Sequence, residues 1–384
     1  MNEQSLKPPV WVARPRELHR MLDHLKHSPR IAVDTESNSL FAYREQVCLI
    51  QFSTRDEDFL VDPLALRDLS ALGDLFASAD KEKIFHAAEY DLICLKRDFG
   101  FDFANIFDTM QAARILGKEK IGLADILLSE FGIQAQKRYQ RANWGERPLS
   151  AQMLAYARLD THYLIELRGR LAKELSERGL SALAQEDFDH LARSAAPNSE
   201  QQPVNCWRIG SGHDLSPQQV AVLQALIDYR EHQAREANVP SFKVISNQIL
   251  IRLAETCPQN AEELANLRLL SPLQNKRYAS GLLQAIRIGL RNPPPPKVHN
   301  HRPDEAVLAR IDLLKEWRKK TARQLGVESD IVLPRDVLEK IAFHPPGSHQ
   351  ELAALMAGFP WRVERFGNEI ITLVQKDQTH ENTF

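Results

Sequence analysis

The sequence of 384 residues lacks several features that would place it in a common class. Its four cysteines, Cys48, Cys94, Cys206 and Cys257, lie far apart without a CxxC pair, which excludes a disulfide scaffold and a standard zinc site. No apolar run approaches the ~18 residues of a membrane-spanning helix, and the first residues, MNEQSLKPPVWVARP, contain no apolar core of a signal peptide. We therefore expect a cytoplasmic protein without a membrane partner.

The sequence also lacks an excess of either charge. Lys and Arg total 49 against 51 Asp and Glu, so a protein that coats nucleic acid through bulk positive charge is excluded. Residues 1–195 hold 26 basic and 30 acidic residues, whereas residues 196–384 hold 23 and 21. The second half is thus mildly basic and contains local clusters such as WRKKTAR (317–323), which suit either a solvated helix face or phosphate contacts.

The first half alternates short apolar runs with longer helical patterns. Three runs are typical of strands, and six segments have helical periodicity. The expected strands are 30–37, 46–54 and 58–63, and the expected helices are 15–27, 67–78, 87–98, 109–117, 123–131 and 150–178. This order predicts an α/β domain with a mixed central sheet over residues 1–195, followed by a linker over 196–209.

The second half contains amphipathic helical patterns interrupted by four consecutive prolines, Pro293 to Pro296. Sliding the chain by 88 positions aligns the two flanking segments without a gap, so that Arg230 falls on Arg318 and Leu250 on Leu338. We infer a tandem duplication of one all-α domain. The predicted domains span 210–292 and 301–384, with a proline-rich linker over 293–300 between them.

Acidic residues end the first expected strand, RIAVDTES. Asp34 and Glu36 are two positions apart, so both carboxylates lie on one face of the strand. A strand end that runs into solvent would explain them equally well. Asp91 lies near the start of the helix expected at 87–98, where its charge suits the helix dipole, yet it shares a face with the apolar Leu92 and Leu95.

A further acid lies within the helical pattern of 149–175. Met153, Tyr156, Asp160, Leu164, Leu167 and Leu171 recur at three- and four-residue steps and form the buried stripe of one long helix. A lone buried charge costs several kcal/mol, and no Lys or Arg lies on this stripe, so Asp160 needs a partner from elsewhere. Tyr156 lies one turn before Asp160 in the same stripe, and we expect Tyr163 to be a core residue.

Four carboxylates attached to apolar elements repel one another unless cations offset their charge. Oxygen ligands without cysteine or clustered histidine favour Mg²⁺ or Mn²⁺ over Zn²⁺. Two such ions ~3.5–4 Å apart are a standard arrangement for attack on a phosphodiester.

These residues carry a family resemblance. The pattern D-x-E (Asp34, Glu36), H-x4-D (His86, Asp91) and Y-x3-D (Tyr156, Asp160) resembles the DEDD exonucleases, and specifically their tyrosine-bearing branch. The histidine-bearing branch would have histidine where this chain has Ala155. Together with the duplicated helical domains, which look like HRDC domains, residues 10–378 resemble the bacterial ribonuclease D family.

The resemblance implies a ribonuclease H-like exonuclease domain followed by two HRDC-type domains. It implies a metal-dependent 3′→5′ exoribonuclease that releases nucleoside 5′-monophosphates from RNA, with tRNA precursors as substrates. Asp34, Glu36, Asp91 and Asp160 would hold two divalent ions, Mg²⁺ or Mn²⁺, and Tyr156 would orient the attacking water. We expect a monomer with no obligatory protein partner.

Several residues are weaker candidates for substrate contacts. They are His86, Leu40, Phe41, Gln51, Arg138, Trp144 and Arg147. The last three belong to KRYQRANWGERPL (137–149), where basic and aromatic residues alternate as in RNA-guiding loops. Each of the others has a structural alternative: a histidine that satisfies the backbone, loop hydrophobes in the core, and a glutamine on an ordinary polar face. Asp108 resembles a recurrent family position but is better explained as the cap of a helix that begins at Thr109.

Two other functions remain open at this point. A 3′→5′ exonuclease acting on DNA would use the same carboxylates, because only contacts to the 2′-hydroxyl separate the two polymers. A nucleic-acid-binding scaffold would depend on the helical domains, and the complete set of acids argues against it.

Overall fold

The computed structural model describes residues 7–135, 137–194, 205–209, 214–296 and 303–381. The described residues form two compact units. One unit contains those within 1–36, 47–197 and 302–384, and the other contains those within 37–46 and 198–301. The first unit thus joins most of the exonuclease-like domain to the second helical domain, and each unit is described by itself.

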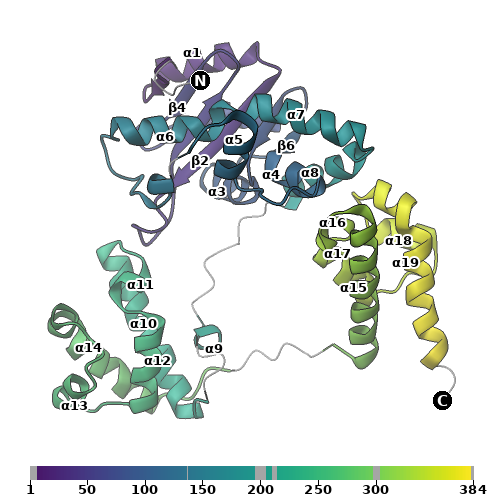
Figure 1. The fold of residues 1–384 in the computed structure, drawn as a ribbon. Coiled ribbons are helices and arrows are strands. Elements are labelled where there is room, and N and C mark those ends of the chain that lie inside the picture. The colour runs from purple at the N-terminus through teal and green to yellow at the C-terminus, as the bar shows by residue number, and fades with distance from the viewer. Residues whose placement is uncertain (1–6, 136, 195–204, 210–213, 297–302, 382–384) are drawn as a thin grey trace. The chain divides into compact units, whose positions relative to one another are not determined.

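A six-stranded sheet forms the centre of the first unit (Figure 1). Its strands lie in the order β1-β4-β3-β2-β5-β6. They are β1 (Val10–Val12), β2 (Arg30–Ser37), β3 (Val47–Ser53), β4 (Asp58–Val61), β5 (Glu82–Phe85) and β6 (Ile106–Asp108). β2 pairs in parallel with β5, and β5 with β6, whereas β3 and β4 are antiparallel. This confirms the predicted α/β class with a mixed sheet.

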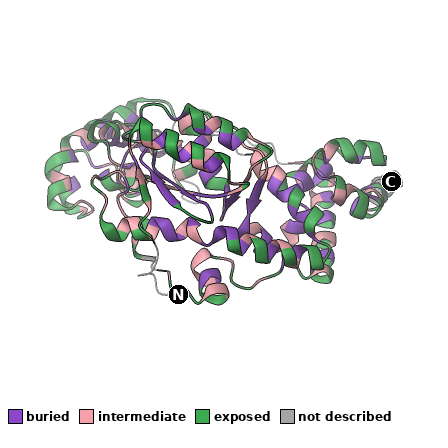
Figure 2. Ribbon diagram, turned by 90° about the horizontal axis from the view of Figure 1, so that it is seen from above, coloured by how far each residue is buried: buried purple, intermediate pink, exposed green. Residues whose placement is uncertain are grey.

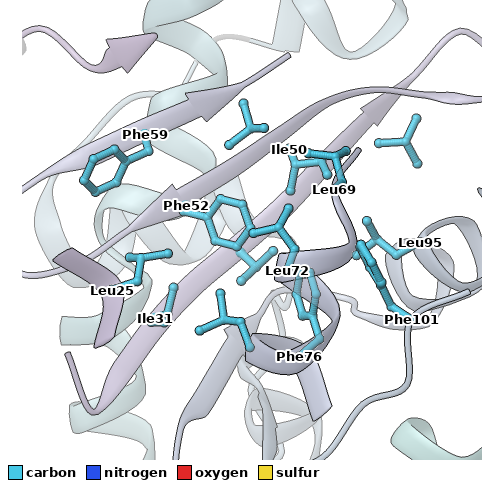
Figure 3. Packing of buried hydrophobic residues seen from close by; sticks show 14 of the residues in the cluster. Leu25, Ile31, Ile50, Phe52, Phe59, Leu69, Leu72, Phe76, Leu95 and Phe101 are labelled. Atoms are coloured by element: carbon cyan, nitrogen blue, oxygen red, sulfur yellow. The ribbon is translucent and has the colours of Figure 1, made fainter. Parts of the chain in front are cut away.

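Helices cover both faces of the sheet, and Figure 2 shows the buried strands beneath their exposed outer surfaces. These helices are α1 (Pro15–Lys26), α2 (Ser70–Ala77), α3 (Glu89–Phe99), α4 (Thr109–Ile115), α5 (Leu123–Phe131), α6 (Ala151–His162), α7 (Leu164–Glu177) and α8 (Ser181–Ser194). α1, α2 and α3 share one hydrophobic core with the sheet, in which Leu25, Phe52 and Phe76 are buried (Figure 3). α4, α7 and α8 share a second core on the opposite face.

The residues of β2 alternate between these two cores. Ile31 and Val33 belong to the core of α1–α3, whereas Ala32 belongs to the core of α4, α7 and α8. Because strand side chains alternate with a period of two, Asp34 and Glu36 lie on the same face as Ala32. The side chain of Thr35, between them, points to the face of α3.

The long helix predicted over 150–178 is instead two helices, so this prediction is wrong. The chain turns at Tyr163, which has φ −94° and ψ −5° and both ends α6 and begins α7. The break lets the two helices pack on different partners, because α6 contacts β3 and β4 whereas α7 contacts β5 and α4. The apolar pattern runs without interruption from α6 into α7 and concealed this break. α7 buries its part of the predicted stripe, whereas Met153, Tyr156 and Asp160 of α6 are only half-buried.

The two helical domains repeat one another element by element. The first contains α10 (Pro217–Ala237), α11 (Ser241–Val244), α12 (Asn247–Thr256), α13 (Ala261–Asn266) and α14 (Pro272–Arg291). The second contains α15 (Glu305–Leu325), α16 (Ser329–Val332), α17 (Arg335–Phe343), α18 (His349–Leu355) and α19 (Pro360–Glu381). Each helix of the second domain begins 88 residues after its counterpart in the first, as the sequence repeat predicts.

Both copies of the repeat share a contact between an arginine and a backbone carbonyl. Arg230 donates to the carbonyl of Ile245 at 3.3 Å, and Arg318 donates to the carbonyl of Leu333 at 2.9 Å. Both pairs are related by the same shift of 88 positions. Arg318, which belongs to the basic cluster WRKKTAR, is therefore a structural residue that fixes α16 to α15.

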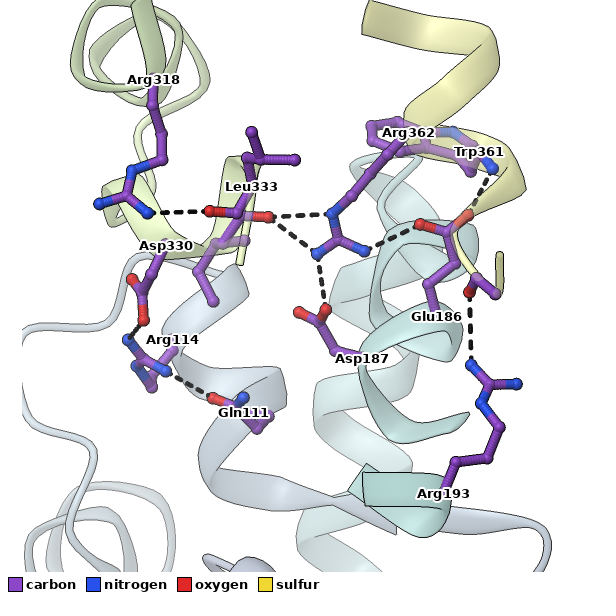
Figure 4. Close-up of polar contacts among 12 residues, drawn as sticks. Gln111, Arg114, Glu186, Asp187, Arg193, Arg318, Asp330, Leu333, Trp361 and Arg362 are labelled. Carbon is purple, nitrogen blue, oxygen red and sulfur yellow. Dashed lines mark hydrogen bonds and ion pairs between the residues drawn. The ribbon is translucent and has the colours of Figure 1, made fainter. Parts of the chain in front are cut away.

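Within the first unit, the second helical domain packs on α8 of the exonuclease-like domain (Figure 4). Arg362 of α19 is fully buried and donates to Glu186 at 2.8 Å and to Asp187 at 2.6 Å. At the same interface, Arg114 of α4 bonds to Asp330 at 2.7 Å, and Ile331 enters the core formed by α4, α7 and α8. The second helical domain therefore completes the hydrophobic core of the exonuclease-like domain.

The predicted linkers lie mostly outside the described residues. In the first, 196–209, the described part includes α9 (Cys206–Ile209), whose Cys206 is buried in the core of the first helical domain, so these residues are not a linker as predicted. In the second, 293–300, only residues 293–296 are described. None of the described helices combines the length and the apolar character needed to cross a membrane.

Candidate active site

Three carboxylates meet at the end of β2. Oxygen atoms of Asp34, Glu36 and Asp160 all lie within 4.8 Å of one another. Asp34 and Glu36 come from β2, and Asp160 comes from α6. The two strand residues face α6 because they alternate with Thr35, and this brings together acids that are more than one hundred residues apart in the sequence.

Polar contacts of the two residues that follow Asp160 fix α6 against the sheet. Thr161 and Ser53 share a hydrogen bond of 2.7 Å between their hydroxyl oxygens. The Nδ1 atom of His162 lies 2.9 Å from an Asp58 carboxylate oxygen. These two contacts join consecutive residues of α6 to β3 and β4, so the position of Asp160 along the sheet is determined.

Asp91 approaches the same strand end from the opposite face of the sheet. It lies in the first turn of α3, is 6% exposed, and accepts a hydrogen bond from the Thr35 hydroxyl at 2.5 Å. It is not part of the three-residue group above, although its charge acts on Asp34, Glu36 and Asp160. The four acids are therefore gathered from both sides of β2.

Burial raises the pKa of each of these carboxyls, and repulsion among them raises it further. The pKa values of Asp34, Glu36 and Asp91 lie well above the usual range, first because of burial and then because of the neighbouring acids. The pKa of Asp160 is raised to about 7, mainly by burial. Among the described residues no Lys or Arg forms an ion pair with any of the four. The arrangement is therefore one that divalent cations would stabilise, and an all-oxygen donor set suits hard ions.

Tyr156 completes this group of side chains. Its hydroxyl hydrogen-bonds to Asp160, one helical turn later. Burial and the charges of Asp160, Glu36 and Asp34 raise its pKa, so the phenol stays protonated at neutral pH. The ring packs beside Trp144 and Tyr139, with centroid distances of 6.1 Å and 5.8 Å. A neutral hydroxyl is thus held at the edge of the acidic group.

Comparison with known proteins agrees with this geometry. A family model described as 3′-5′ exonuclease matches residues 9–176, and the HRDC domain model matches residues 219–286 and 307–374. Ribonuclease D of Bartonella henselae is 31% identical over 365 residues, which cover 93% of this chain and 88% of that protein. The chain belongs to the ribonuclease D family. The family and the duplicated HRDC domains predicted from the sequence are thereby confirmed.

Other relatives share part of this architecture. The exosome complex exonuclease RRP6 of Saccharomyces cerevisiae is 33% identical over 299 residues, and the match covers 74% of this chain but 41% of that longer protein. The crystal structure of Escherichia coli RNase D aligns with a TM-score of 0.68 at 23% identity, and the alignment covers 96% of this chain and 99% of that chain. The three-domain fold of the ribonuclease D family is thus present throughout the chain.

In this ribonuclease D family member, Asp108 does more than cap a helix. As predicted, its side chain caps α4 by accepting from the backbone of Met110 and Gln111. It also accepts from the backbone of Ala87 at 3.1 Å and of Ala88 at 2.7 Å. Ala87 has φ +64°, a left-handed conformation that is uncommon for alanine. Asp108 therefore holds the turn from which α3 and Asp91 begin, a role for which the sequence offers no signal.

His86 lies in the same turn. Its Nδ1 atom is 2.9 Å from the Thr109 hydroxyl, and that hydroxyl donates to the carbonyl of Phe85 at 3.0 Å. Burial lowers the pKa of His86, so the ring is neutral at physiological pH. These contacts agree with the structural alternative for His86, and its contact with substrate stays a prediction.

Gln51 does not lie on an ordinary polar face of its strand, which was the structural alternative for this residue. It is fully buried on β3, between Leu49, which packs with Trp144 and Ala157, and Ser53, which bonds to Thr161 of α6. Neither its amide nitrogen nor its amide oxygen has a hydrogen-bond partner among the described residues. A buried amide without a hydrogen-bond partner costs roughly 1–3 kcal/mol. This cost favours the prediction that a bound substrate supplies the missing partner of Gln51.

The segment before α6 carries the remaining candidates. Arg147 forms a two-pronged ion pair with Asp62, at 2.7 and 2.8 Å, and also donates to the carbonyl of Cys48. Trp144 is 1% exposed in the core beneath Tyr156. Trp144 thus supports α6, whereas Arg147 is held to the sheet; contact of either residue with substrate stays a prediction. Arg138 is exposed, and its guanidinium lies 5.7 Å from the Tyr139 ring centroid, where it remains accessible to a phosphate.

Leu40 and Phe41 lie in the loop between β2 and β3, which belongs to the second unit with the first helical domain. Leu40 is 38% exposed. Phe41 is half-buried, and the Lys243 ammonium lies 4.2 Å from its ring centroid. Both side chains therefore lie in the same unit as the first helical domain, which the sequence does not reveal.

Proposed function

We propose that the chain is a metal-dependent 3′→5′ exoribonuclease. It removes nucleotides from the 3′ ends of RNA, in particular tRNA precursors, and releases nucleoside 5′-monophosphates. The observation that carries the proposal is the group of half-buried carboxylates at the end of β2, which forms no ion pair with a basic residue among the described ones. RNA as the substrate is supported by the name of the Bartonella relative, ribonuclease D.

Asp34, Glu36, Asp91 and Asp160 are the residues that we propose as ligands of two divalent ions, Mg²⁺ or Mn²⁺. When bound, such ions lower the pKa of a water molecule and stabilise the charge on the leaving 3′ oxygen. Asp34, Glu36 and Asp160 are near enough to share an ion. Asp91, which comes from the other face of the sheet, would complete the set of ligands.

Tyr156 would position the attacking water rather than deprotonate it. Its raised pKa keeps the phenol protonated, and its hydrogen bond to Asp160 fixes the direction of the hydroxyl. The water would attack the terminal phosphorus and lose a proton to solvent, the bond to the 3′ oxygen of the preceding nucleotide would break, and that oxygen would take a proton from solvent. Gln51 is the side chain with unused hydrogen-bonding groups that would contact the substrate near this point.

We further propose that the protein acts in the cytoplasm as a monomer. The joined core of the exonuclease-like and second helical domains supports a catalytic unit that needs no partner chain. Sedimentation equilibrium across a range of concentrations tests this, with a constant mass of one chain as the expected result.

The direct test of the function uses RNA and DNA of matched sequence, each labelled at the 5′ or the 3′ end, with Mg²⁺, Mn²⁺ or a chelator. We expect early release of the 3′ label as a nucleoside 5′-monophosphate from RNA with either metal, and no release with chelator. Faster hydrolysis of DNA would make the protein a DNA exonuclease, and release from the 5′ end would contradict the proposed direction.

A further inference from the structure

A cleft in the second unit lies between the loop that follows β2 and one corner of the first helical domain. The loop side contributes Ser39, Tyr43 and Glu45, and the helical side contributes Phe242, Asn247 and Gln248. The cleft has a volume of about 510 Å³, within the ~300–1,000 Å³ range of ligand-binding clefts. It lies outside the acidic group at the end of β2.

The loop is fixed to the helical domain by polar and aromatic contacts. The backbone nitrogen of Tyr43 donates to the side chain of Asn238 at 3.2 Å. The Arg235 guanidinium lies 5.5 Å from the centroid of the Tyr43 ring, and the Lys243 ammonium lies 4.2 Å from that of Phe41. These contacts thus hold the loop and the helical domain together as the two walls of one cleft.

The cleft combines an exposed aromatic ring with uncommitted polar groups. Phe242 of α11 is 56% exposed, which is unusual for a phenylalanine in a folded domain. Gln248, at the start of α12, is exposed and has no hydrogen bond among the described residues. An exposed ring beside a free amide suits a nucleobase, which stacks through its face and forms hydrogen bonds through its edge.

One acid, Glu45, lines the cleft, and the cation Lys243 directly follows the lining residue Phe242 in the chain. Lys243 is exposed and has no carboxylate partner among the described residues. Glu45, on the loop side, accepts a hydrogen bond from Ser37 at 2.7 Å. A nucleotide whose base lies against Phe242 and Gln248 therefore has a cation for its phosphate in Lys243, the residue that follows Phe242.

The second helical domain provides an internal comparison. A shift of 88 positions places Phe242 on Asp330 and Lys243 on Ile331. In the second copy this corner docks on the exonuclease-like domain, because Asp330 pairs with Arg114 and Ile331 enters its core. The same corner is thus an interaction surface in both copies, but the first copy carries an aromatic ring and a cation in place of an acid and an aliphatic side chain.

We propose that this cleft binds one nucleotide of single-stranded RNA, with Phe242 as the stacking platform and Lys243 as the phosphate contact. The proposal rests on the proposed function, since it assumes an RNA substrate. It assigns different roles to the two helical copies, so that the first holds RNA and the second completes the core of the catalytic domain.

The test measures the affinity of the full-length protein for a single-stranded RNA oligonucleotide by fluorescence anisotropy, with chelator present to prevent hydrolysis. Phe242→Ala should weaken binding roughly tenfold or more, because base stacking contributes about 1–3 kcal/mol. Phe242→Trp should retain binding. Lys243→Ala should lower the salt dependence of log K by about 0.7, the value for one phosphate contact on a single strand.

The matched control is Arg335→Ala, which removes an exposed cation at the equivalent corner of the second copy and should leave the affinity unchanged. A 4-thiouridine placed successively along the oligonucleotide should cross-link to the peptide that contains Phe242. Wild-type affinity in both Phe242→Ala and Lys243→Ala, without this cross-link, would overturn the proposal while RNA hydrolysis by the wild type upheld the proposed function. A wild type that hydrolyses no RNA would instead overturn the function itself.

Discussion

The Thr35 hydroxyl donates a hydrogen bond to the Asp91 carboxylate at 2.5 Å, and this contact joins β2 to α3. Thr35 lies between Asp34 and Glu36 in the sequence, but its side chain points to the opposite face of the sheet. One strand end therefore presents two carboxylates to α6 and one hydroxyl to α3. This alternation explains how acids from both faces gather at one place.

Replacing Thr35 by valine tests the importance of this contact. Thr35→Val preserves the shape of the side chain but leaves Asp91 without its donor. Loss of such a supporting hydrogen bond typically costs 10–100-fold in metal affinity or activity. We expect a weaker response to Mg²⁺ in a titration of RNA hydrolysis, with Thr35→Ser behaving as the wild type. A valine variant with the wild-type Mg²⁺ dependence would show that Asp91 needs no support from Thr35.

Gln51 should reveal a conflict between stability and activity. Gln51→Leu removes a buried amide that has no partner, so the variant should unfold at a higher temperature, with a gain of about 1 kcal/mol or more. If Gln51 contacts the substrate, the same variant should hydrolyse RNA more slowly. Thermal unfolding and kcat/KM measured on one preparation check both effects. Lower stability with unchanged activity would mean that the amide has a structural role.

The raised pKa of Asp160, about 7, predicts an unusual pH dependence for the metal-free protein. The folded state binds this proton more tightly than the unfolded state, whose carboxyl has a pKa near 3.8. The contribution of Asp160 to the free energy of unfolding should therefore fall as the pH rises from about 4 to about 7, by up to ~1.4 kcal/mol per pH unit for one proton, and then level off. Asp34, Glu36 and Asp91, whose pKa values are also raised, add changes of the same sign.

Divalent metal should remove this part of the pH dependence, because bound carboxylates are already deprotonated. Urea unfolding at several pH values, with chelator or with saturating Mg²⁺, compares the two slopes. Asp160→Asn in chelator is the control and should lack the contribution of this carboxyl. Equal slopes with and without Mg²⁺ in the wild type would argue against metal binding at Asp160.

The buried pair of acids around Arg362 should make the second helical domain essential for stability. Arg362→Met leaves Glu186 and Asp187 buried without their cation, which typically costs about 3–5 kcal/mol. Denaturant unfolding should show this loss, and the triple variant that also carries Glu186→Gln and Asp187→Asn should recover much of it. The exposed pair of Arg335 with Glu339 is the control, since removing it should change the stability by about 0.5 kcal/mol or less.

The sequence predicts the elements with long or strongly periodic patterns. β2 and α1 begin and end close to their expected positions, and the duplicated domains follow from the shift of 88 positions. β1, β5 and β6 were not predicted, because strands of three or four residues are too short for periodicity to identify. The break at Tyr163 was missed because α6 and α7 share one apolar stripe.

In the candidate site, too, the sequence predicts some of the residues and not others. The acids could be found from the sequence because a carboxylate on an apolar face is anomalous wherever it occurs. The support by Thr35 and Asp108 could not be found, since each depends on contacts between residues distant in the sequence. For the same reason, the sequence did not reveal that the contacts of Arg147 hold it to Asp62 and Cys48.

The most direct measurement of the central claim compares the wild type and Asp160→Asn in the release of nucleoside 5′-monophosphate from 3′-labelled RNA with Mg²⁺. Removing one of the clustered carboxylates should abolish turnover, while the far-ultraviolet spectrum and cooperative unfolding stay those of a folded protein. Asp34→Asn should behave in the same way. Turnover by Asp160→Asn at the wild-type rate would contradict the assignment of the carboxylates at the end of β2 as the active site.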